Sequence, residues 1–193
     1  MTELILASNN EHKAGEIQAA IGDKVLIKSL KQVGIEIDIP EPHDTLEANS
    51  IEKCRVIHNL TGKNCIGEDT GLEVEELNGE PGVKSARYAG EDRSFDKNIE
   101  KVLTRLKGKQ NREARFRTVI SLIWENQEYQ FEGICEGKII EQPSGAKGFG
   151  YDPIFCPSGT NRTFAEMDVE EKNEYSHRRK AADKLIQFLK TQR

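Results

Sequence analysis

Residues 3–27 read ELILASNNEHKAGEIQAAIGDKVLI, which is a pattern of strand, loop, helix and strand. Residues 3–7, which contain the apolar run 4–7, predict a short buried strand. Residues 10–21 predict a helix that ends at Gly22, and residues 25–27 predict a second strand. A chain that opens with this alternation is predicted to have an α/β fold.

The rest of the chain predicts three more helices. Their apolar residues recur at helical spacing, Asp44 or Thr45 is the expected N-cap of the first, and Ser94 is the expected N-cap of the second. Gly62 and Gly108 are expected to end these two helices. The three helices are predicted at residues 45–60, 95–106 and 177–190.

Four strands are predicted between these helices. Two short strands, 64–68 and 72–76, are expected on either side of a turn at Thr70-Gly71. Two long strands, 114–125 and 128–141, are expected to form a hairpin joined at Asn126-Gln127. Strands of this length favour a twisted antiparallel ribbon within a mixed sheet.

Length and composition predict one globular domain that covers residues 1–193, or at most two small ones. The longest apolar run, residues 4–7, is far shorter than the roughly 20 residues of a membrane helix. No basic segment precedes it, so no signal peptide is expected, and four scattered cysteines without CxxC spacing favour reduced thiols in the cytoplasm. The net charge of −5 argues against a nucleic-acid polymer as partner.

The loop after the first strand is a candidate anion site. Its residues are Ser8, Asn9, Asn10, Glu11, His12 and Lys13. Main-chain amides at a helix start attract anions. A lysine in the first turn opposes the helix dipole, so its presence is easier to understand if it holds a phosphate. The alternative, that residues 8–10 only cap the helix, stays open.

Acidic residues in two places form a candidate metal site. Glu41 precedes the helix predicted at 45–60, and the pair Glu68-Asp69 closes a predicted strand. Adjacent residues of a strand point to opposite faces, so at most one of this pair faces a given pocket unless the strand has ended. Glu41 and Asp69 would suit Mg²⁺, which takes one or two carboxylates plus waters and phosphates. The alternative is ordinary surface acids.

A glycine-rich loop and a basic helix start are two further candidates. Residues 148–153 read GFGYDP, whose two aromatics could stack on a planar ring while Asp152 accepts from its N–H groups. The alternative is a turn with its aromatics in the core. Basic residues at 177–180, with Lys172 before them, oppose the helix dipole, so a bound anion would explain them. The alternative is a solvated basic face.

These segments occur together in one order along the chain. They comprise residues 7–10 with Lys13 and Glu16, residues 68–74, 81–83, 85–90, 148–155 and 163–166, and Lys172 with residues 176–178. Together they resemble the inosine triphosphate pyrophosphatase family, the XTP/dITP diphosphatases. The resemblance covers about residues 4–190.

The resemblance implies an α/β fold with an elongated, twisted mixed sheet flanked by helices, a central nucleotide cleft and a homodimer. It implies Mg²⁺-dependent hydrolysis of non-standard purine nucleoside triphosphates (ITP, dITP, XTP) to the monophosphate and pyrophosphate, which cleanses the nucleotide pool. Asp69 would be the general base and, with Glu41, a metal ligand. Substrate binding would involve Ser8, Asn9, Asn10, Glu11, His12, Lys13, Thr70, Phe149, Gly150, Tyr151, Asp152, Lys172, His177 and Arg178.

The chain departs from the family pattern at three positions. Glu68 stands where bacterial members commonly have Asp, Thr70 where many have Ser, and Ala48 where many have Glu. Whether Glu47 or Glu68 replaces the carboxylate missing at position 48 stays open. Two alternative functions also stay open: a pyrophosphatase for other modified nucleotides, pyrimidines included, and a nucleotide-binding module without catalysis.

Overall fold

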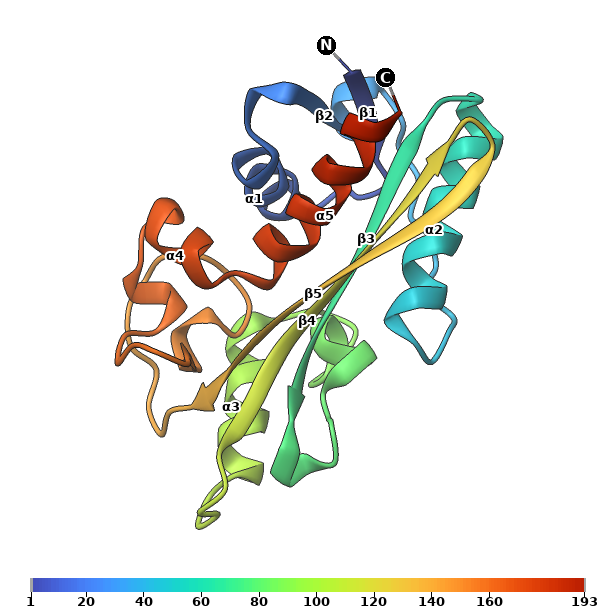
Figure 1. Cartoon of the computed structure of the whole chain (residues 1–193). Coiled ribbons are helices and arrows are strands. Elements are labelled where there is room, and N and C mark those ends of the chain that lie inside the picture. Colours follow the sequence, from blue (N-terminus) through green and yellow to red (C-terminus); the bar gives the residue numbers. More distant parts are fainter. Residues whose placement is uncertain (1, 193) are drawn as a thin grey trace. The chain divides into compact units, whose positions relative to one another are not determined.

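A computed structural model describes residues 2–192 and confirms the α/β fold (Figure 1). The described chain alternates helices with strands that form a six-stranded sheet. In chain order the elements are β1 (Thr2–Leu6), α1 (Glu11–Ile21), β2 (Val25–Ser29), α2 (Leu46–Thr61), β3 (Cys65–Val74), α3 (Phe95–Arg105), β4 (Glu113–Trp124), β5 (Gln127–Ile139), β6 (Phe155–Pro157), α4 (Val169–Tyr175) and α5 (His177–Thr191).

The sheet is mixed, as the sequence predicts. Its strands are hydrogen-bonded in the order β2-β1-β3-β4-β5-β6. β1 runs parallel to both β2 and β3, whereas β5 and β6 are antiparallel. Parallel β1 and β2 are joined through α1, which is the βαβ connection that the opening sequence predicts.

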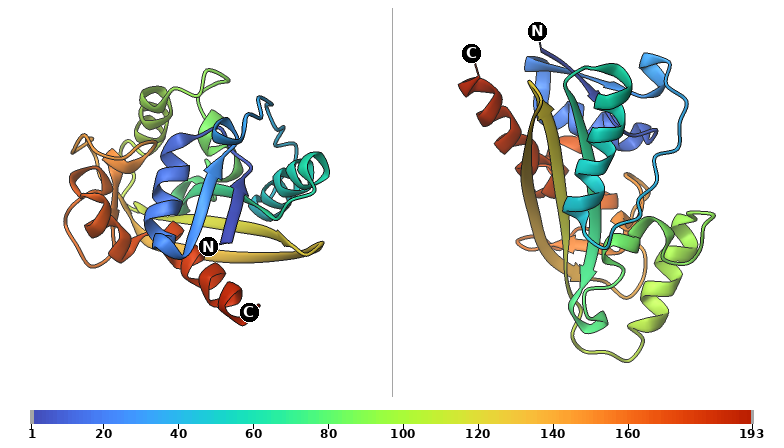
Figure 2. Two further views of the ribbon diagram at one scale, coloured as in Figure 1. Left: turned by 90° about the horizontal axis from the view of Figure 1, so that it is seen from above. Right: turned by 90° about the vertical axis from the view of Figure 1, so that its right-hand side faces the viewer.

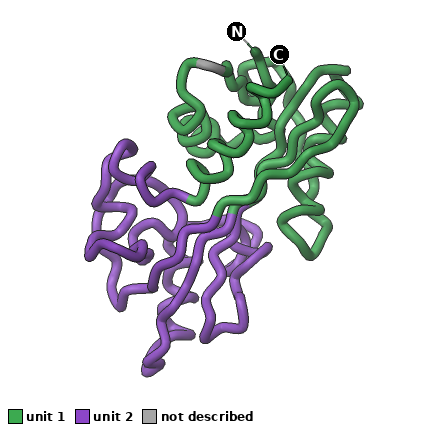
Figure 3. The backbone as a smooth tube through the Cα atoms, in the orientation of Figure 1, with its two compact units in different colours: residues 1–69, 118–133, 177–193 green, residues 70–117, 134–176 purple. Residues whose placement is uncertain are grey.

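The chain divides into two compact units (Figure 3). Unit 1 comprises residues 1–69, 118–133 and 177–193, and unit 2 comprises residues 70–117 and 134–176. Strands β3, β4 and β5 contribute residues to both units. The single domain over residues 1–193 stays a prediction.

The core of unit 1 forms around β1 and β3. Helix α1 contacts β2 and α5 (Figures 1 and 2), and its buried residues join apolar side chains of β1, β3, β4 and α5. Gly133 of β5 lies directly against the start of α5, because a Cβ atom there would meet the main-chain oxygen of His177 at 2.0 Å. The missing side chain therefore lets α5 begin on the sheet.

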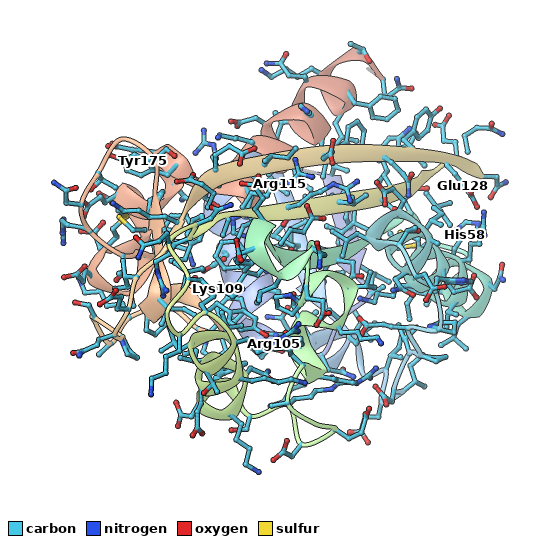
Figure 4. The ribbon with its side chains drawn as sticks, turned by 90° about the horizontal axis from the view of Figure 1, so that it is seen from below. His58, Arg105, Lys109, Arg115, Glu128 and Tyr175 are labelled. Atoms are coloured by element: carbon cyan, nitrogen blue, oxygen red, sulfur yellow. The ribbon has the colours of Figure 1, made fainter. Side chains whose placement is uncertain are left out.

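Helix α2 of unit 1 is attached to the β4–β5 hairpin by polar contacts. The hydroxyls of Ser50 and Ser121 are 2.5 Å apart. The Arg55 guanidinium donates to both carboxylate oxygens of Glu128, at 2.7 and 2.8 Å. His58 contacts the side chain of Asn126, and Figure 4 labels His58 and Glu128 at this end of the hairpin. These contacts anchor the helix that carries part of the candidate site.

Unit 2 has its own aromatic core. Phe116 and Phe155 pack edge to face with ring centroids 4.6 Å apart, and the rings of Phe155 and Phe164 are 5.2 Å apart. Buried residues of α3, among them Ile99 and Val102, pack against this cluster. The two units therefore each bury a separate apolar cluster.

Four local predictions are corrected by the structure. Strand β3 runs unbroken through Thr70-Gly71, so the predicted turn there is wrong. The hairpin turn lies one residue earlier than predicted, at Glu125-Asn126, where both residues have the positive φ that a two-residue turn requires. Phe95 at the start of α3 is exposed instead of joining its apolar stripe.

The fourth correction concerns α4, which the sequence pattern did not predict. Its seven residues follow the N-cap Asp168, whose side chain accepts from the main-chain N–H of Glu171. Among residues 2–192, no helix has both the length and the apolar character needed to cross a membrane.

Candidate functional site

Glu68 and Asp69 lie in the middle of β3 and belong to two different ionic groups. The Glu68 carboxylate contacts Lys13 of α1 at 2.7 Å and Arg178 of α5 at 3.1 Å. Arg178 also donates to Glu16 at 2.8 Å. The alternation expected of a strand explains the separation, because Asp69 instead contacts α2.

The second group brings together Asp69, Lys53 and Glu41 of unit 1. The Lys53 ammonium lies 3.4 Å from Oδ1 of Asp69, donates to the main-chain oxygen of Glu68 at 3.2 Å and forms an ion pair with Glu41. Asp69 and Lys53 are each 5% exposed. Lys53 and Asp69 are therefore shielded from bulk water, while the partly exposed Glu41 completes the group at its solvent side.

The charges of this group shift one another's pKa. Burial raises the pKa of Asp69, and the cations Lys53 and Lys13 oppose that shift. Burial disfavours the Lys53 ammonium, but Asp69, Glu41 and Glu68 outweigh it, so the pKa of Lys53 is raised. A buried carboxyl with a raised pKa beside a charged partner is typical of a functional site.

The donor set of this group fits a hard divalent cation. Oδ2 of Asp69 is buried and has no hydrogen-bond partner among residues 2–192. Within the same range, no three His, Cys, Asp or Glu side chains form a complete metal site. A cation held by Glu41 and Asp69 would need waters and substrate phosphates as further ligands, which is the coordination that Mg²⁺ prefers.

The loop before α1 is ordered by its own side chains. Asn10 is the N-cap of α1, and its side chain accepts from the main-chain N–H of Lys13 at 3.2 Å. The Ser8 hydroxyl accepts from the main-chain N–H of Asn10 at 3.1 Å, and Asn9 donates to the main-chain oxygen of Ile37 at 2.8 Å. Glu11 and His12 follow in the exposed first turn of α1. Both capping and an anion site are compatible with this geometry.

The arginines at the start of α5 are held by ion pairs that the sequence pattern did not predict. His177 and Arg178 are buried, and Arg178 is paired with Glu68 and Glu16. Arg179 is paired with Asp183 one turn along the helix. Ion pairs therefore account for both arginines without a bound anion, and the alternative of a solvated basic face does not hold for the buried His177 and Arg178.

In unit 2 the glycine-rich loop is held by a buried ion pair. Oδ2 of Asp152 accepts from the Lys172 ammonium at 2.6 Å and from the main-chain N–H of Phe149 at 3.0 Å. A Cβ atom on Gly148 would meet the same Oδ2 at 2.0 Å, and φ of Gly148 is +71°. The loop therefore requires glycine at position 148 to close on Asp152.

The aromatic residues of this loop differ in their accessibility. Phe149 is half-buried, with its ring centroid 6.1 Å from that of the exposed Phe95. Tyr151 is buried, and its hydroxyl donates to the main-chain oxygen of Ser85 at 2.6 Å. Gly150 and Thr70 are also half-buried in this unit. Phe149 is thus the more accessible of the two aromatic residues of the loop.

The structure brings together several predicted residues within each unit. Unit 1 joins Glu41 with Asp69, and Lys13 with Arg178 through Glu68. Unit 2 joins Phe149, Asp152 and Lys172. The Glu68 carboxylate pairs with Lys13 and Arg178, whereas the Asp69 carboxylate contacts Lys53. The functional roles of all these residues stay predictions.

Lys53 is the charged residue of the site that the sequence reading missed. Its signal is its position in α2: Leu46, Ser50, Cys54 and Ile57 are buried at helical spacing, and Lys53 falls on the same stripe. A lysine is almost never fully buried without a partner. A lysine on a buried stripe therefore indicates a carboxylate nearby.

Comparison with known proteins gives a consistent result over nearly the whole chain. The model of the Ham1 family matches residues 4–188. A dITP/XTP pyrophosphatase of Flavobacterium psychrophilum is 48% identical over 188 residues, which cover 97% of this chain and 99% of the relative. A dITP/XTP pyrophosphatase of Porphyromonas gingivalis is 47% identical, with 98% of each chain covered.

Solved structures agree with this match. The Ham1 protein of Staphylococcus aureus is similar with a TM-score of 0.89 and 37% identity, and all of both chains is covered. The nucleoside-triphosphatase or dITP/XTP pyrophosphatase of Mycobacterium abscessus is similar with a TM-score of 0.76 and 36% identity, over 95% of this chain and 98% of the other.

Proposed function

This chain belongs to the Ham1 family, and on that basis we propose that it is a dITP/XTP pyrophosphatase that converts a non-standard purine nucleoside triphosphate to its monophosphate and pyrophosphate. The observation that carries the proposal is the pair Glu41 and Asp69 beside Lys53, in a chain related over its full length to such enzymes. The buried Oδ2 of Asp69 gives this pair an atom available for a cation or a water molecule.

The unit 1 residues would perform the hydrolysis. Glu41 and Asp69 would hold Mg²⁺, which when bound would offset phosphate charge and lower the pKa of water. Asp69 would accept the proton of the attacking water, a role that its raised pKa favours. Lys13, Lys53 and the main-chain amides at the start of α1 would bind the triphosphate as its negative charge increases.

Recognition of the base would depend on the direction of hydrogen bonds. Hypoxanthine and xanthine carry an oxygen at C6, where adenine carries an amino group. A donor from His177 or Arg178 directed at that oxygen would leave adenine with two facing donors, and mismatches of this type discriminate by roughly 10⁴–10⁵. In unit 2, Asp152 and Lys172 would fix the glycine-rich loop that carries the accessible ring of Phe149.

A nucleotide panel with product analysis tests the function. The purified enzyme is incubated with Mg²⁺ and each of dITP, ITP, XTP, ATP, GTP and TTP, and pyrophosphate and single phosphate are measured separately. We expect pyrophosphate release that is fastest for the three non-standard purines. Faster turnover of TTP, or release of single phosphate only, would contradict the proposal.

Replacement of Asp69 tests the assignment of the base. Asp69→Asn keeps the size of the side chain but removes its capacity to accept a proton. We expect turnover to fall by a factor of at least about 10², the usual effect of losing a positioned base, while nucleotide binding persists.

The expected homodimer is tested independently by light scattering of the purified protein as it elutes from a size-exclusion column.

A further inference from the structure

The segment that carries Glu41 has no regular secondary structure. Residues 35–45 connect a short helical turn, Lys31–Val33, to α2 without forming a helix or strand. Ile39 is buried in an apolar cluster of unit 1, and the main-chain oxygen of Ile37 accepts from Asn9. A carboxylate in such a segment needs specific contacts if its position is to be fixed.

Asn49 of α2 provides a two-point contact just beyond Glu41. Its Oδ1 accepts from the main-chain N–H of His43 at 2.9 Å, and its Nδ2 donates to the main-chain oxygen of His43 at 3.0 Å. Asn49 is fully buried. Both ends of the amide are therefore used on one residue, and loss of either bond would leave buried polar atoms unpaired.

Asn49 and Lys53 lie four residues apart, and so on the same face of α2. Asn49 holds the main chain at His43, and Lys53 pairs with the side chain of Glu41 two residues earlier. Lys53 also contacts Asp69, so this helix face connects the segment to the second carboxylate.

We propose that Asn49 is a positioning residue for Glu41: its amide fixes the main chain at His43, so that the Glu41 carboxylate is directed toward Lys53 and Asp69. The proposal rests on the proposed function in that it takes Glu41 as a ligand of the catalytic cation. Asn49 could instead have a purely structural role that is limited to supporting the start of α2. The experiment must distinguish this role from the positioning of Glu41.

A double-mutant cycle separates the two readings. Asn49→Ala and Glu41→Gln are made singly and together, and the Mg²⁺ concentration for half-maximal pyrophosphate release is measured for each. Loss of a residue that orients a metal ligand typically weakens metal affinity by about 10–100-fold. We expect at least a tenfold increase for Asn49→Ala in the wild-type background and no further change in the Glu41→Gln background. Equal increases in both backgrounds would overturn the proposal.

Two measurements do not depend on turnover. Mn²⁺ binding, followed by electron paramagnetic resonance, is expected to weaken in Asn49→Ala by a similar factor. Hydrogen exchange is expected to become faster for residues 38–45 and to stay unchanged for β1 and β3. Unchanged exchange of residues 38–45 would overturn the proposal even if the wild type released no pyrophosphate, so failure of the inference and of the proposed function are distinguishable.

The chain offers a matched control and a substitute variant. His43→Ala removes an exposed side chain but keeps the peptide groups that Asn49 binds, so its Mg²⁺ dependence is expected to stay within about twofold of wild type. If Asn49→Ala does not fold, Asn49→Ser removes the same two bonds with a smaller change in polarity. An effect of His43→Ala equal to that of the Asn49 variant would overturn the proposal.

Discussion

The ammonium of Lys53 lies 3.4 Å from Oδ1 of Asp69, and both groups are almost completely buried within unit 1. The same ammonium is paired with Glu41. The Lys53 ammonium thus offsets part of the negative charge of the two carboxylates proposed to hold Mg²⁺, and it keeps them together when Mg²⁺ is absent. Lys53 therefore reduces the cost of burying the charged Asp69 and takes part in the proposed chemistry.

Lys53→Met is expected to lower both activity and stability. Removal of one partner of a buried ion pair typically costs about 3–5 kcal/mol, because the remaining charge is left buried and unpaired. Loss of a donor to developing phosphate charge typically costs about 10²–10³ in kcat. Urea unfolding and steady-state kinetics with dITP measure the two effects.

The exposed Lys31 provides the control for this prediction. Lys31→Met removes the same charge at a site of little burial, and it is expected to change stability by less than about 0.5 kcal/mol. If Lys53→Met kept a turnover within a few-fold of wild type, Lys53 would have no role in the reaction.

Asp69→Asn is expected to stabilise the metal-free protein at neutral pH. Burial raises the pKa of Asp69 in the folded state, so the folded state binds this proton more tightly than the unfolded chain does. Ionisation of Asp69 therefore costs stability as pH rises above the ordinary aspartate pKa of about 3.9. Asparagine does not ionise and avoids this cost.

Thermal unfolding in EDTA between pH 4 and 8 measures this difference. The melting temperature of Asp69→Asn minus that of the wild type is expected to increase with pH. A difference that decreases with pH would mean that the positive charges of Lys53 and Lys13 outweigh burial. Glu3→Gln is a control for which the melting-temperature difference from wild type is expected to decrease with pH, because the contact with Lys28 lowers the pKa of that exposed carboxyl.

Sequence patterns predict the bounds of helices and strands better than the tertiary contacts between them. The predicted bounds of helices α1, α2 and α5 agree with the structure to within a residue or two, because caps and apolar spacing are local features. The sequence predicts a turn at Gly71, but this residue lies inside β3, where a Cβ atom would meet the main-chain oxygen of Gly82 at 2.7 Å. The glycine is needed for a close approach that only the folded chain reveals.

The candidate site shows the same limit. Glu68 and Asp69 contact different cations, as alternation along a strand predicts, but the strand end predicted at this pair is wrong because β3 continues to Val74. The partners of Arg178 could not be predicted, because Glu16 and Glu68 are more than one hundred residues away along the chain. Lys53 was missed for the same reason, although its position on a buried stripe was a usable signal.

Asp152→Ala is expected to destabilise unit 2 and to weaken nucleotide binding. The Lys172 ammonium is buried and donates to Asp152 at 2.6 Å, so loss of the carboxylate typically costs about 3–5 kcal/mol. The double variant Asp152→Leu with Lys172→Met removes both charges and is expected to recover most of this stability. KM for dITP is expected to stay raised in both variants, and recovery of a normal KM in the double variant would remove this pair from nucleotide binding.

Gly67→Ala is expected to destabilise unit 1 at the point where β3 passes α2. A Cβ atom at this position would meet the main-chain oxygen of Ser50 at 2.1 Å, and neither backbone can move without disturbing Asp69 two residues later. Overpacking of this type typically costs about 1–3 kcal/mol. Gly15→Ala is the matched control. Gly15 lies in α1, and a Cβ atom there would meet nothing within 4 Å outside the backbone of its own helix, so alanine is expected to stabilise the protein by about 0.5–1 kcal/mol. Urea unfolding of the two variants should therefore shift in opposite directions, and a Gly67→Ala protein as stable and active as wild type would show that β3 and α2 are not in the contact described.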